Sequence, residues 1–373
     1  MRSPFSFINK QLLFLHTFPF MVAGVVFVYM RCCFAPSQGG APLPSQDVLQ
    51  PDMAQGEYEF VTSAFNTDCR LVLFGERYKV HQAYAQCSQR LFALHNTLNA
   101  FDPNSELARF NQAPPETPVP LSPLFWRAFS AASFAFQETQ GAFDVTIAPL
   151  MHFWKEVAKT PEAPENQGNP LEERRQRLME AVGFSRLAWD DNAHTVTKPA
   201  QETQLDFGGL AKGLALDILR ETLAEEEIEY YYISLGGNTL QHLPPNHPFQ
   251  NVCALADMRE GQEGKEACTV SGTHGLCLAT SANTLRPIAS ASAPRPMGHI
   301  LNPQDGSPVA PPYRSVTAVC DTGWRSDAYS TAVFVQGAPL AESLLKANLA
   351  KGFILLPADD SPPLVLGDIQ LLP

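Results

Sequence analysis

The stretch "LDFGGLAKGLALD", residues 205–217, decides how this chain is interpreted. Asp206 leads into the glycine pair Gly208 and Gly209, and an apolar helical pattern begins directly afterwards. Glycines at a strand-to-helix junction let the backbone approach another group closely, and the first amides of a helix attract anions. Lys212 adds a positive charge in the first turn. The stretch therefore predicts either an anion-binding loop or a plain tight turn with a solvated lysine.

Two common nucleotide-binding patterns do not fit this stretch. It lacks the Gly-Lys-Ser/Thr ending of a Walker A loop, and it does not match the GxGxxG fingerprint of a dinucleotide-binding crossover. The chain is also acidic, with a formal net charge of −12 over 373 residues and no dense basic run, which disfavours a nucleic-acid partner. An acidic protein that binds a phosphate-bearing ligand needs local help from helix N-termini, backbone amides or a divalent cation.

A second segment, "RSDAYSTA" (residues 325–332), places oxygen donors together. If this segment is a helix capped by Ser326, Asp327 and Thr331 are four residues apart and share one face. A carboxylate beside a hydroxyl suits a hard cation such as Mg²⁺. The alternative is structural, because an acidic residue in the first turn of a helix is stabilising by itself.

Two further segments offer candidates for acid–base chemistry or ligand binding. His299 precedes a turn in "GHILNPQDGSPV" (298–309), where it is either a general base or a structural histidine. Asp144 follows a glycine and an aromatic residue in "GAFDVTIAPLMHFW" (141–154), where it either binds a ligand or caps a turn. The eight cysteines form no CxxC pair, so a zinc site is not predicted, and buried free thiols are favoured over disulfides.

The amino-terminal part of the chain predicts export. Residues 11–30 carry no charged side chain and are flanked by Lys10 and Arg31. We expect residues 1–34 to be a signal peptide or membrane anchor and 35–56, rich in proline and glutamine, to be a linker. Residues 57–373 then form one exported domain at the periplasmic side of the cell inner membrane.

Within this domain, strand and helix patterns mix without strict alternation, which predicts an α+β fold. Alternating apolar residues over 58–74 indicate a hairpin, and the stripe from 81 to 98 indicates a helix. Ser105 and Ser122 are predicted helix caps, with Pro123 at the first helical position. Further helices are expected over 171–183, 210–225 and from Pro339. A hairpin is expected around Asp191–Asn192. Strands are expected from Tyr230 to the glycine pair Gly236–Gly237 and over 250–257, 267–281 and 314–321.

The combined motifs closely resemble the ApbE family of FAD-dependent flavin transferases. The resemblance covers residues 58–357 in six ordered segments: "NAFDPNSELARFN" (99–111), "GAFDVTIAPLMHFW", "LDFGGLAKGLALD", "YYISLGGNTL" (231–240), "GHILNPQDGSPV" and "VTAVCDTGWRSDAYSTAVFVQG" (316–337). It implies two interwoven α/β subdomains with mixed sheets. It also implies Mg²⁺-dependent transfer of FMN from FAD to a threonine or serine of a partner redox protein, with release of AMP.

The resemblance also assigns roles to residues. It implies Mg²⁺ ligands at Ala211, through its backbone oxygen, and at Asp327 and Thr331, and catalytic roles for His299 and Asp327. The implied FAD contacts are Phe65, Ala100, Phe101, Asp144, Gly208, Gly209, Lys212 and His299. The sequence departs from the family pattern at "AFNT" (64–67), where Phe65 replaces a methionine and Asn66 a glycine.

Two other functions remain open from the sequence. The same residues could serve an FAD pyrophosphatase that releases FMN and AMP, or a protein that binds FAD without catalysis. The presence of a candidate proton acceptor at His299 argues against simple storage of flavin. The acceptor protein is not identified by the sequence.

Overall fold

The computed structural model describes residues 55–159, 170–258, 265–283 and 298–372. The expected signal or anchor (1–34) and nearly all of the expected linker (35–56) lie outside these residues. Among the helices of the described residues, none is both long enough and apolar enough to cross a membrane. The six cysteines that the structure describes are free thiols, as the sequence favoured.

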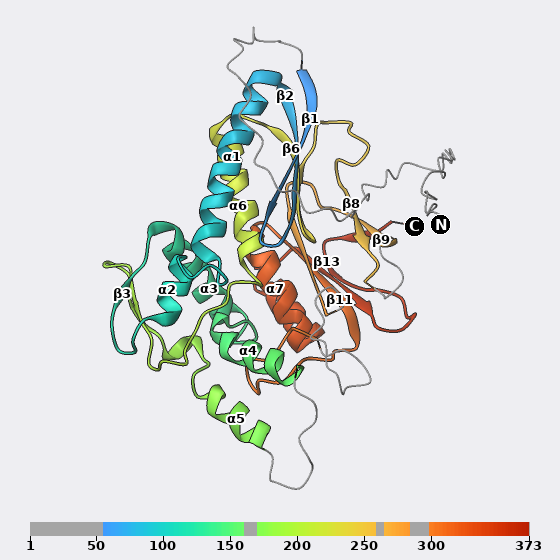
Figure 1. Ribbon diagram of the computed structural model, residues 1–373. Helices are drawn as coiled ribbons and strands as arrows, with labels where there is room; N and C mark the ends of the chain where they lie inside the picture. The colour runs from blue at the N-terminus through green and yellow to red at the C-terminus, as the bar shows by residue number, and fades with distance from the viewer. Residues whose placement is uncertain (1–54, 160–169, 259–264, 284–297, 373) are drawn as a thin grey trace, which may run out of the picture. The chain divides into compact units, whose positions relative to one another are not determined.

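An eight-stranded sheet forms the centre of the domain (Figure 1). Its strand order is β1-β2-β6-β7-β10-β11-β12-β13, so neighbours in space are often distant in sequence. The bounds are β1 (Gln55–Ala64), β2 (Thr67–Glu76), β6 (Tyr230–Leu235), β7 (Asn238–His242), β10 (Cys277–Ala282), β11 (Tyr313–Cys320), β12 (Gly352–Pro357) and β13 (Leu364–Gly367). The α+β class is confirmed with one refinement, because the described strand pairings are antiparallel rather than mixed.

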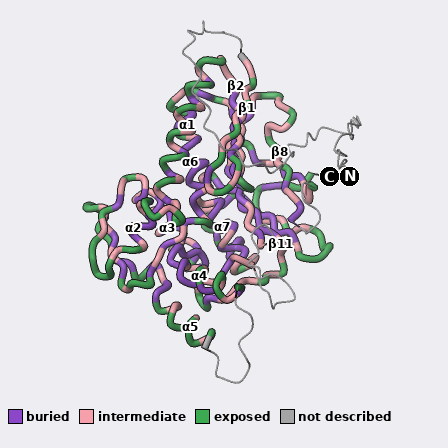
Figure 2. The backbone as a smooth tube through the Cα atoms, viewed as in Figure 1, coloured by how far each residue is buried: buried purple, intermediate pink, exposed green. Residues whose placement is uncertain are grey.

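Three helices cover one face of this sheet: α1 (Arg77–Leu98), α6 (Ala211–Glu225) and α7 (Gly323–Gln336). Apolar side chains alternate along the strands, and those on the helix side, such as Leu71 and Ile233, join the main core with Leu94 of α1 and Leu214 of α6. Figure 2 shows buried backbone concentrated where α6 and α7 meet the sheet. Burial on both sides explains why α6 is apolar around most of its circumference.

The opposite face of the sheet is covered by a second, smaller sheet of β8 (Val252–Ala256), β9 (Glu266–Ser271) and β14 (Gln370–Leu371). A separate core lies between the two sheets and includes Leu278, Ile354 and Ile369. The strand expected over 267–281 is therefore two strands, β9 and β10, which belong to different sheets. Gly272 and Gly275 between them have positive φ angles, which glycine adopts without steric cost.

The remaining elements surround the helical layer. Ser105 caps α2 and Ser122 caps α3, as predicted, and Pro123 begins α3. The predicted helix over 171–183 ends earlier, at Met179. The bounds are α2 (Glu106–Gln112), β3 (Val119–Pro120), α3 (Pro123–Glu138), η1 (Val145–Ile147), α4 (Ala148–Val157), α5 (Pro170–Met179), η2 (Phe184–Arg186), β4 (Ala188–Asp190), β5 (Thr195–Thr197) and α8 (Ala338–Lys346).

The start of α7 differs from the prediction. Ser326 was expected to cap this helix, but α7 begins at Gly323 and Thr322 makes no side-chain capping bond. Ser326 lies inside the helix, where its hydroxyl donates to the Gly323 carbonyl at 2.8 Å. The first amides of α7 are instead satisfied by Asp217 of α6. A cap from a distant segment leaves no local sequence signal, which explains the error.

Several turns and strand ends meet at one end of the sheet. The β1–β2 turn at Phe65 and Asn66 lies beside the β6–β7 turn, because a Cβ added to Gly236 would be 2.7 Å from the Thr67 side chain. The amide of Thr280, near the end of β10, donates to the Gly237 carbonyl at 3.2 Å. The fold therefore brings three separate loop and strand ends to the end of the sheet where α6 begins.

Candidate active site

The glycine loop that precedes α6 packs against two other segments. A Cβ on Gly209 would lie 3.3 Å from the Thr331 hydroxyl oxygen and 3.1 Å from the ring of Phe143, so only a glycine leaves both contacts undisturbed. The amide of Asp206 donates to the Val145 carbonyl at 2.7 Å and ties the loop to η1. The loop thus lies between α7 and the segment that contains Asp144.

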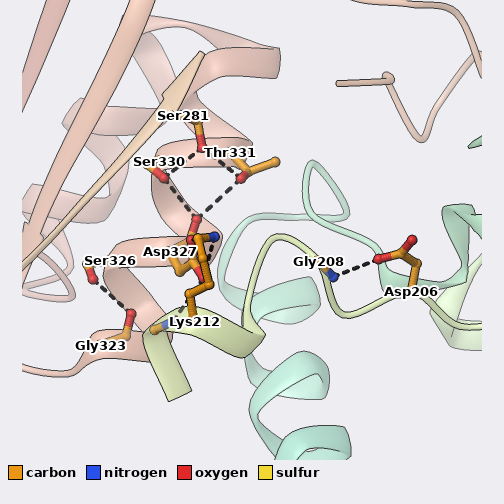
Figure 3. Close-up of polar contacts among 10 residues, drawn as sticks. Asp206, Gly208, Lys212, Ser281, Gly323, Ser326, Asp327, Ser330 and Thr331 are labelled. Carbon is orange, nitrogen blue, oxygen red and sulfur yellow. Dashed lines mark hydrogen bonds and ion pairs between the residues drawn. The ribbon is translucent and has the colours of Figure 1, made fainter. Parts of the chain in front are cut away.

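One amide of this loop is already used. The N–H of Gly208 donates to Asp206 Oδ1 at 2.6 Å, which closes a local turn (Figure 3). The sequence predicted either an anion-binding loop or a plain tight turn here, and the bond made by the Gly208 amide is that of a tight turn. An anion would have to compete with Asp206 for this donor.

The Asp327 carboxylate joins α7 to the start of α6. Its Oδ1 atom is 3.3 Å from the Lys212 ammonium, and its Oδ2 atom accepts a hydrogen bond of 2.9 Å from the Gly213 amide (Figure 3). Asp327 is nearly fully buried, whereas the Lys212 side chain is 19% exposed. The carboxylate is therefore enclosed by the protein, whereas the ammonium group of Lys212 still reaches solvent.

Hydroxyl groups extend the oxygen cluster one turn further along α7. Ser281, from the end of β10, lies 2.9 Å from the hydroxyl oxygens of both Ser330 and Thr331. Thr331 also donates to the Asp327 carbonyl at 3.3 Å. The predicted pair Asp327 and Thr331 is therefore on one helical face, as expected. The sequence analysis did not predict Ser281 as part of this cluster. Its hydrogen bonds depend on β10 lying beside α7, which the sequence pattern does not reveal.

The donors present fit a hard divalent cation. Asp327 offers a carboxylate, Thr331 a hydroxyl and Ala211, the first residue of α6, a backbone carbonyl, which are oxygen ligands of the kind that Mg²⁺ accepts. The close approach of Gly209 to Thr331 brings the loop to this face of α7. No cluster of three His, Cys, Asp or Glu side chains that could hold a metal occurs in the described part of the chain. A magnesium ion held by Ala211, Asp327 and Thr331 stays a prediction.

Asp144 has a structural role in this fold. Its Oδ1 atom accepts from the Thr146 amide at 2.8 Å and from the Thr146 hydroxyl at 2.6 Å, and its Oδ2 atom accepts from the Phe184 amide at 2.9 Å. It caps η1, which is the capping alternative that the sequence left open. Burial raises the pKa of Asp144, and its hydrogen bonds oppose that rise. Contact with a flavin stays a prediction for this residue.

Three of the predicted flavin contacts, Phe65, Ala100 and Phe101, lie near the carboxyl-terminal end of α1. The amide of Phe65 donates to His95 Nδ1 at 3.2 Å, and the two rings meet edge to face. Phe65 lies in the β1–β2 turn and has a φ of 53°. This left-handed conformation is uncommon for an aromatic residue. Phe101 is 79% exposed and lies with Ala100 in the turn that follows α1. An exposed aromatic ring here could stack on a ligand.

His299 lies in a loop that is anchored to the end of β10. The amide of its neighbour Ile300 donates to Asn283 Oδ1 at 3.2 Å, and Asn283 Nδ2 donates to the Val309 carbonyl at 2.8 Å. Asn283 is two residues beyond Ser281, so the His299 loop and the hydroxyl cluster are attached to the same strand end. This places His299 on the side of the sheet where the oxygen donors gather.

Comparison with known proteins identifies the family of this chain. The family model described as the ApbE family matches residues 65–353. The chain belongs to the ApbE family. It is 26% identical over 270 residues to the FAD:protein FMN transferase of Haemophilus influenzae, covering 70% of this chain and 75% of that protein. It is 22% identical over 268 residues to the Escherichia coli K12 protein of the same name, covering 71% and 74% respectively.

Solved structures of ApbE proteins share the fold. The flavin transferase ApbE of Vibrio cholerae aligns with a TM-score of 0.69 at 20% identity, covering 84% of this chain and 97% of that one. The ApbE protein of Thermotoga maritima aligns with the same TM-score at 23% identity, covering 85% and 97%. Within this ApbE chain, the predicted residues Gly209, Lys212, Asp327 and Thr331 lie together, and the segment of Asp144 adjoins them.

Proposed function

We propose that this ApbE chain transfers FMN from FAD to a threonine or serine hydroxyl of a partner redox protein and releases AMP. The observation that carries the proposal is the convergence of Lys212, Asp327 and Thr331 beside the glycine loop. The relatives named FAD:protein FMN transferase support the choice of donor and of transferred group. The partner protein is defined here only by the threonine or serine hydroxyl that accepts FMN.

The proposed reaction exchanges one phosphorus–oxygen bond for another. The acceptor hydroxyl oxygen attacks the phosphorus on the FMN side of the diphosphate. The bond between this phosphorus and the bridging oxygen breaks, and AMP leaves with the bridging oxygen and its electron pair. The hydroxyl proton passes to a base. Negative charge grows on the leaving oxygens, so fixed positive charge and donors aimed at them lower the barrier.

Lys212 and Asp327 are suited to organise the diphosphate. Lys212 is partly exposed and can move its ammonium from Asp327 towards phosphate oxygens. Ala211, Asp327 and Thr331 would hold Mg²⁺, which when bound neutralises phosphate charge. Asp327 is itself fixed by the Gly213 amide, so the carboxylate is presented in one orientation. Without a counter-ion, a diphosphate would be repelled by Asp206 and Asp327 in this acidic protein.

His299 is the proposed proton acceptor. An imidazole takes up a proton near neutral pH, and the loop that carries this one is fixed to β10 through Asn283. Asp144 is the weaker candidate, because its two carboxylate oxygens already accept three hydrogen bonds from Thr146 and Phe184. A carboxylate that caps a helix is not free to move towards a substrate.

The decisive experiment measures flavin attached to an acceptor. Purified protein is incubated with FAD, Mg²⁺ and a flavin-carrier domain that contains the acceptor hydroxyl, and in-gel fluorescence detects FMN on the carrier. Replacing Asp327 with asparagine is expected to slow transfer about 100-fold, because the metal site and the anchor of Lys212 are both weakened. Asp321→Asn makes the same chemical change just before α7, at a side chain that is 64% exposed, and should retain activity.

Other outcomes decide between the remaining functions. Free FMN with an unlabelled carrier would favour an FAD pyrophosphatase, in which water takes the place of the acceptor hydroxyl. Tight FAD binding with neither product would favour a binding protein without catalysis. Full transfer activity in Asp327→Asn would contradict the metal assignment at this position.

We also propose that the protein works at the periplasmic side of the inner membrane. The uncharged segment 11–30 between Lys10 and Arg31 supports this location. Fractionation of cells that express the full chain tests it. The protein is expected in the membrane or periplasmic fraction, and recovery only from the cytosol would contradict the location.

A further inference from the structure

Helices α6 and α7 touch through their backbones at one point. A Cβ added to Gly213 would be 2.1 Å from the Gly323 carbonyl oxygen, and a Cβ added to Gly323 would be 2.1 Å from the Gly213 carbonyl oxygen. No real side chain tolerates such a distance, so both positions require glycine. The start of each helix is therefore pressed directly against the start of the other.

Two buried carboxylates bind across this contact in opposite directions. Asp217 of α6 accepts hydrogen bonds of 2.7 Å and 3.0 Å from the amides of Gly323 and Trp324, the first two residues of α7. Asp327 of α7 accepts from the amide of Gly213 near the start of α6 at 2.9 Å. Neither helix has a side-chain cap from its own N-cap residue. Each helix is capped by a carboxylate of the other.

A third link reinforces the Asp217 side of this arrangement. Arg220, one turn later on α6, donates to Asp217 Oδ1 at 2.8 Å and to the backbone carbonyl of Asp321 at 2.8 Å. Asp217 is only 3% exposed, so its charge is held by this guanidinium and by the two amides rather than by water. Asp321, just before α7, is thereby fixed to α6 through its carbonyl, and the first two residues of α7 are fixed through their amides.

We propose that Asp217 is a positioning residue for Asp327. The proposal rests on the function proposed above, in which Asp327 binds the metal ion. Asp327 lies four residues after Gly323, one turn along α7, so the placement of the α7 start sets the placement of its carboxylate against Gly213 and Lys212. Asp217 touches neither Lys212 nor Thr331 in any described hydrogen bond, and it acts through the helix. It is not a catalytic residue.

The test uses Asp217→Asn in the full chain, with two readouts that do not require transfer. An asparagine of nearly the same shape keeps one acceptor oxygen but turns an NH₂ group towards one of the two amides. Mn²⁺ alone is titrated and its binding followed by electron paramagnetic resonance, and hydrogen exchange is followed at the Gly213 amide. We expect Mn²⁺ affinity to fall roughly 10-fold, as for other residues that orient a metal ligand. We expect the Gly213 amide to exchange faster, since its acceptor Asp327 has moved.

Glu221→Gln is the matched control. It makes the same carboxylate-to-amide change on the same helix, but Glu221 pairs with Arg127 on α3 and is half exposed. Its Mn²⁺ affinity and Gly213 exchange should equal those of the wild type. If Asp217→Asn does not fold, Arg220→Gln weakens the same link at a partly exposed side chain and should shift both readouts in the same direction by a smaller factor.

The outcomes separate this inference from the proposed function. Unchanged Gly213 exchange and unchanged Mn²⁺ affinity in a folded Asp217→Asn protein would overturn the positioning role. A wild-type protein that binds no Mn²⁺ would overturn the metal site instead, and Gly213 exchange would then decide the role of Asp217 by itself. Faster exchange together with weaker Mn²⁺ binding, absent from Glu221→Gln, supports it.

Discussion

At the scale of single residues, Asn238 is the side chain whose environment fits its chemistry least well. It is fully buried at the start of β7, and neither its Nδ2 nor its Oδ1 atom has a hydrogen-bond partner in the described structure. A buried polar group without a partner costs about 1–3 kcal/mol. We expect Asn238→Leu, which has a similar branched shape, to raise the free energy of unfolding by an amount of this order in urea titrations.

Asn283 provides the comparison for that prediction. Its side-chain amide is satisfied on both sides, by Val309 and by Ile300. Asn283→Leu should therefore lower the free energy of unfolding, because it leaves two backbone groups without their partner. Equal losses of stability in both variants would show that Asn238 is satisfied by a group outside the described residues.

Residue-level prediction from sequence succeeded where the partners are close in the chain. Asp327 and Thr331 were placed on one face because helical periodicity alone decides that question. Ser281 and Asp217 received no role, because their partners lie 50 and 106 residues away. The chemistry of a side chain can be read locally, whereas its partner depends on the tertiary fold.

At the scale of elements, helix caps were also predicted correctly when the capping partner is local and incorrectly when it is distant in sequence. Ser105 and Ser122 were predicted because each accepts from an amide three residues later. The start of α7 was misplaced because its cap comes from α6. The single strand predicted over 267–281 is two strands, β9 and β10, in different sheets. The prediction joined them because both are apolar and only the turn at Gly272 separates them. Local patterns give the type of an element more securely than its end.

The cap of η1 gives a prediction about pH. Burial raises the pKa of Asp144, so the native state binds its proton more tightly than the unfolded state does. This contribution to stability is complete below the unfolded pKa of about 3.9 and is lost as the pH rises through the folded pKa. We expect the free energy of unfolding of the wild type, minus that of Asp144→Asn, to decrease as the pH rises above about 4.

Urea titrations at several pH values measure this difference. Asp190→Asn makes the same change in an exposed turn and is the reference for the loss of one negative charge. A difference between wild type and Asp144→Asn that rises with pH would mean that the hydrogen bonds to Thr146 and Phe184 outweigh burial.

At the scale of the whole domain, the candidate site lies on one face of the central sheet and the second hydrophobic core lies on the other. Its helix-covered face carries the glycine loop, Lys212, Asp327 and Thr331, whereas its other face packs against the small sheet of β8, β9 and β14. The sequence predicted most of these strands but not their order, because strands with similar apolar patterns can pair in many ways. The resemblance to a known family, not the pattern, gave the architecture.

This separation predicts that the second core contributes to stability without contributing to the site. Ile369 connects β13 to β14, is 5% exposed and packs in the second core. Ile369→Ala should lower the free energy of unfolding by about 2–5 kcal/mol, because it removes buried methylene groups and leaves a cavity. Transfer activity measured well below the unfolding transition should remain at the wild-type level, since none of the residues assigned to the site belongs to this core.

Leu214→Ala, the corresponding deletion beneath the start of α6, should reduce both stability and transfer. If Ile369→Ala also slowed transfer at a temperature where it is fully folded, the two faces of the sheet would have to be mechanically coupled.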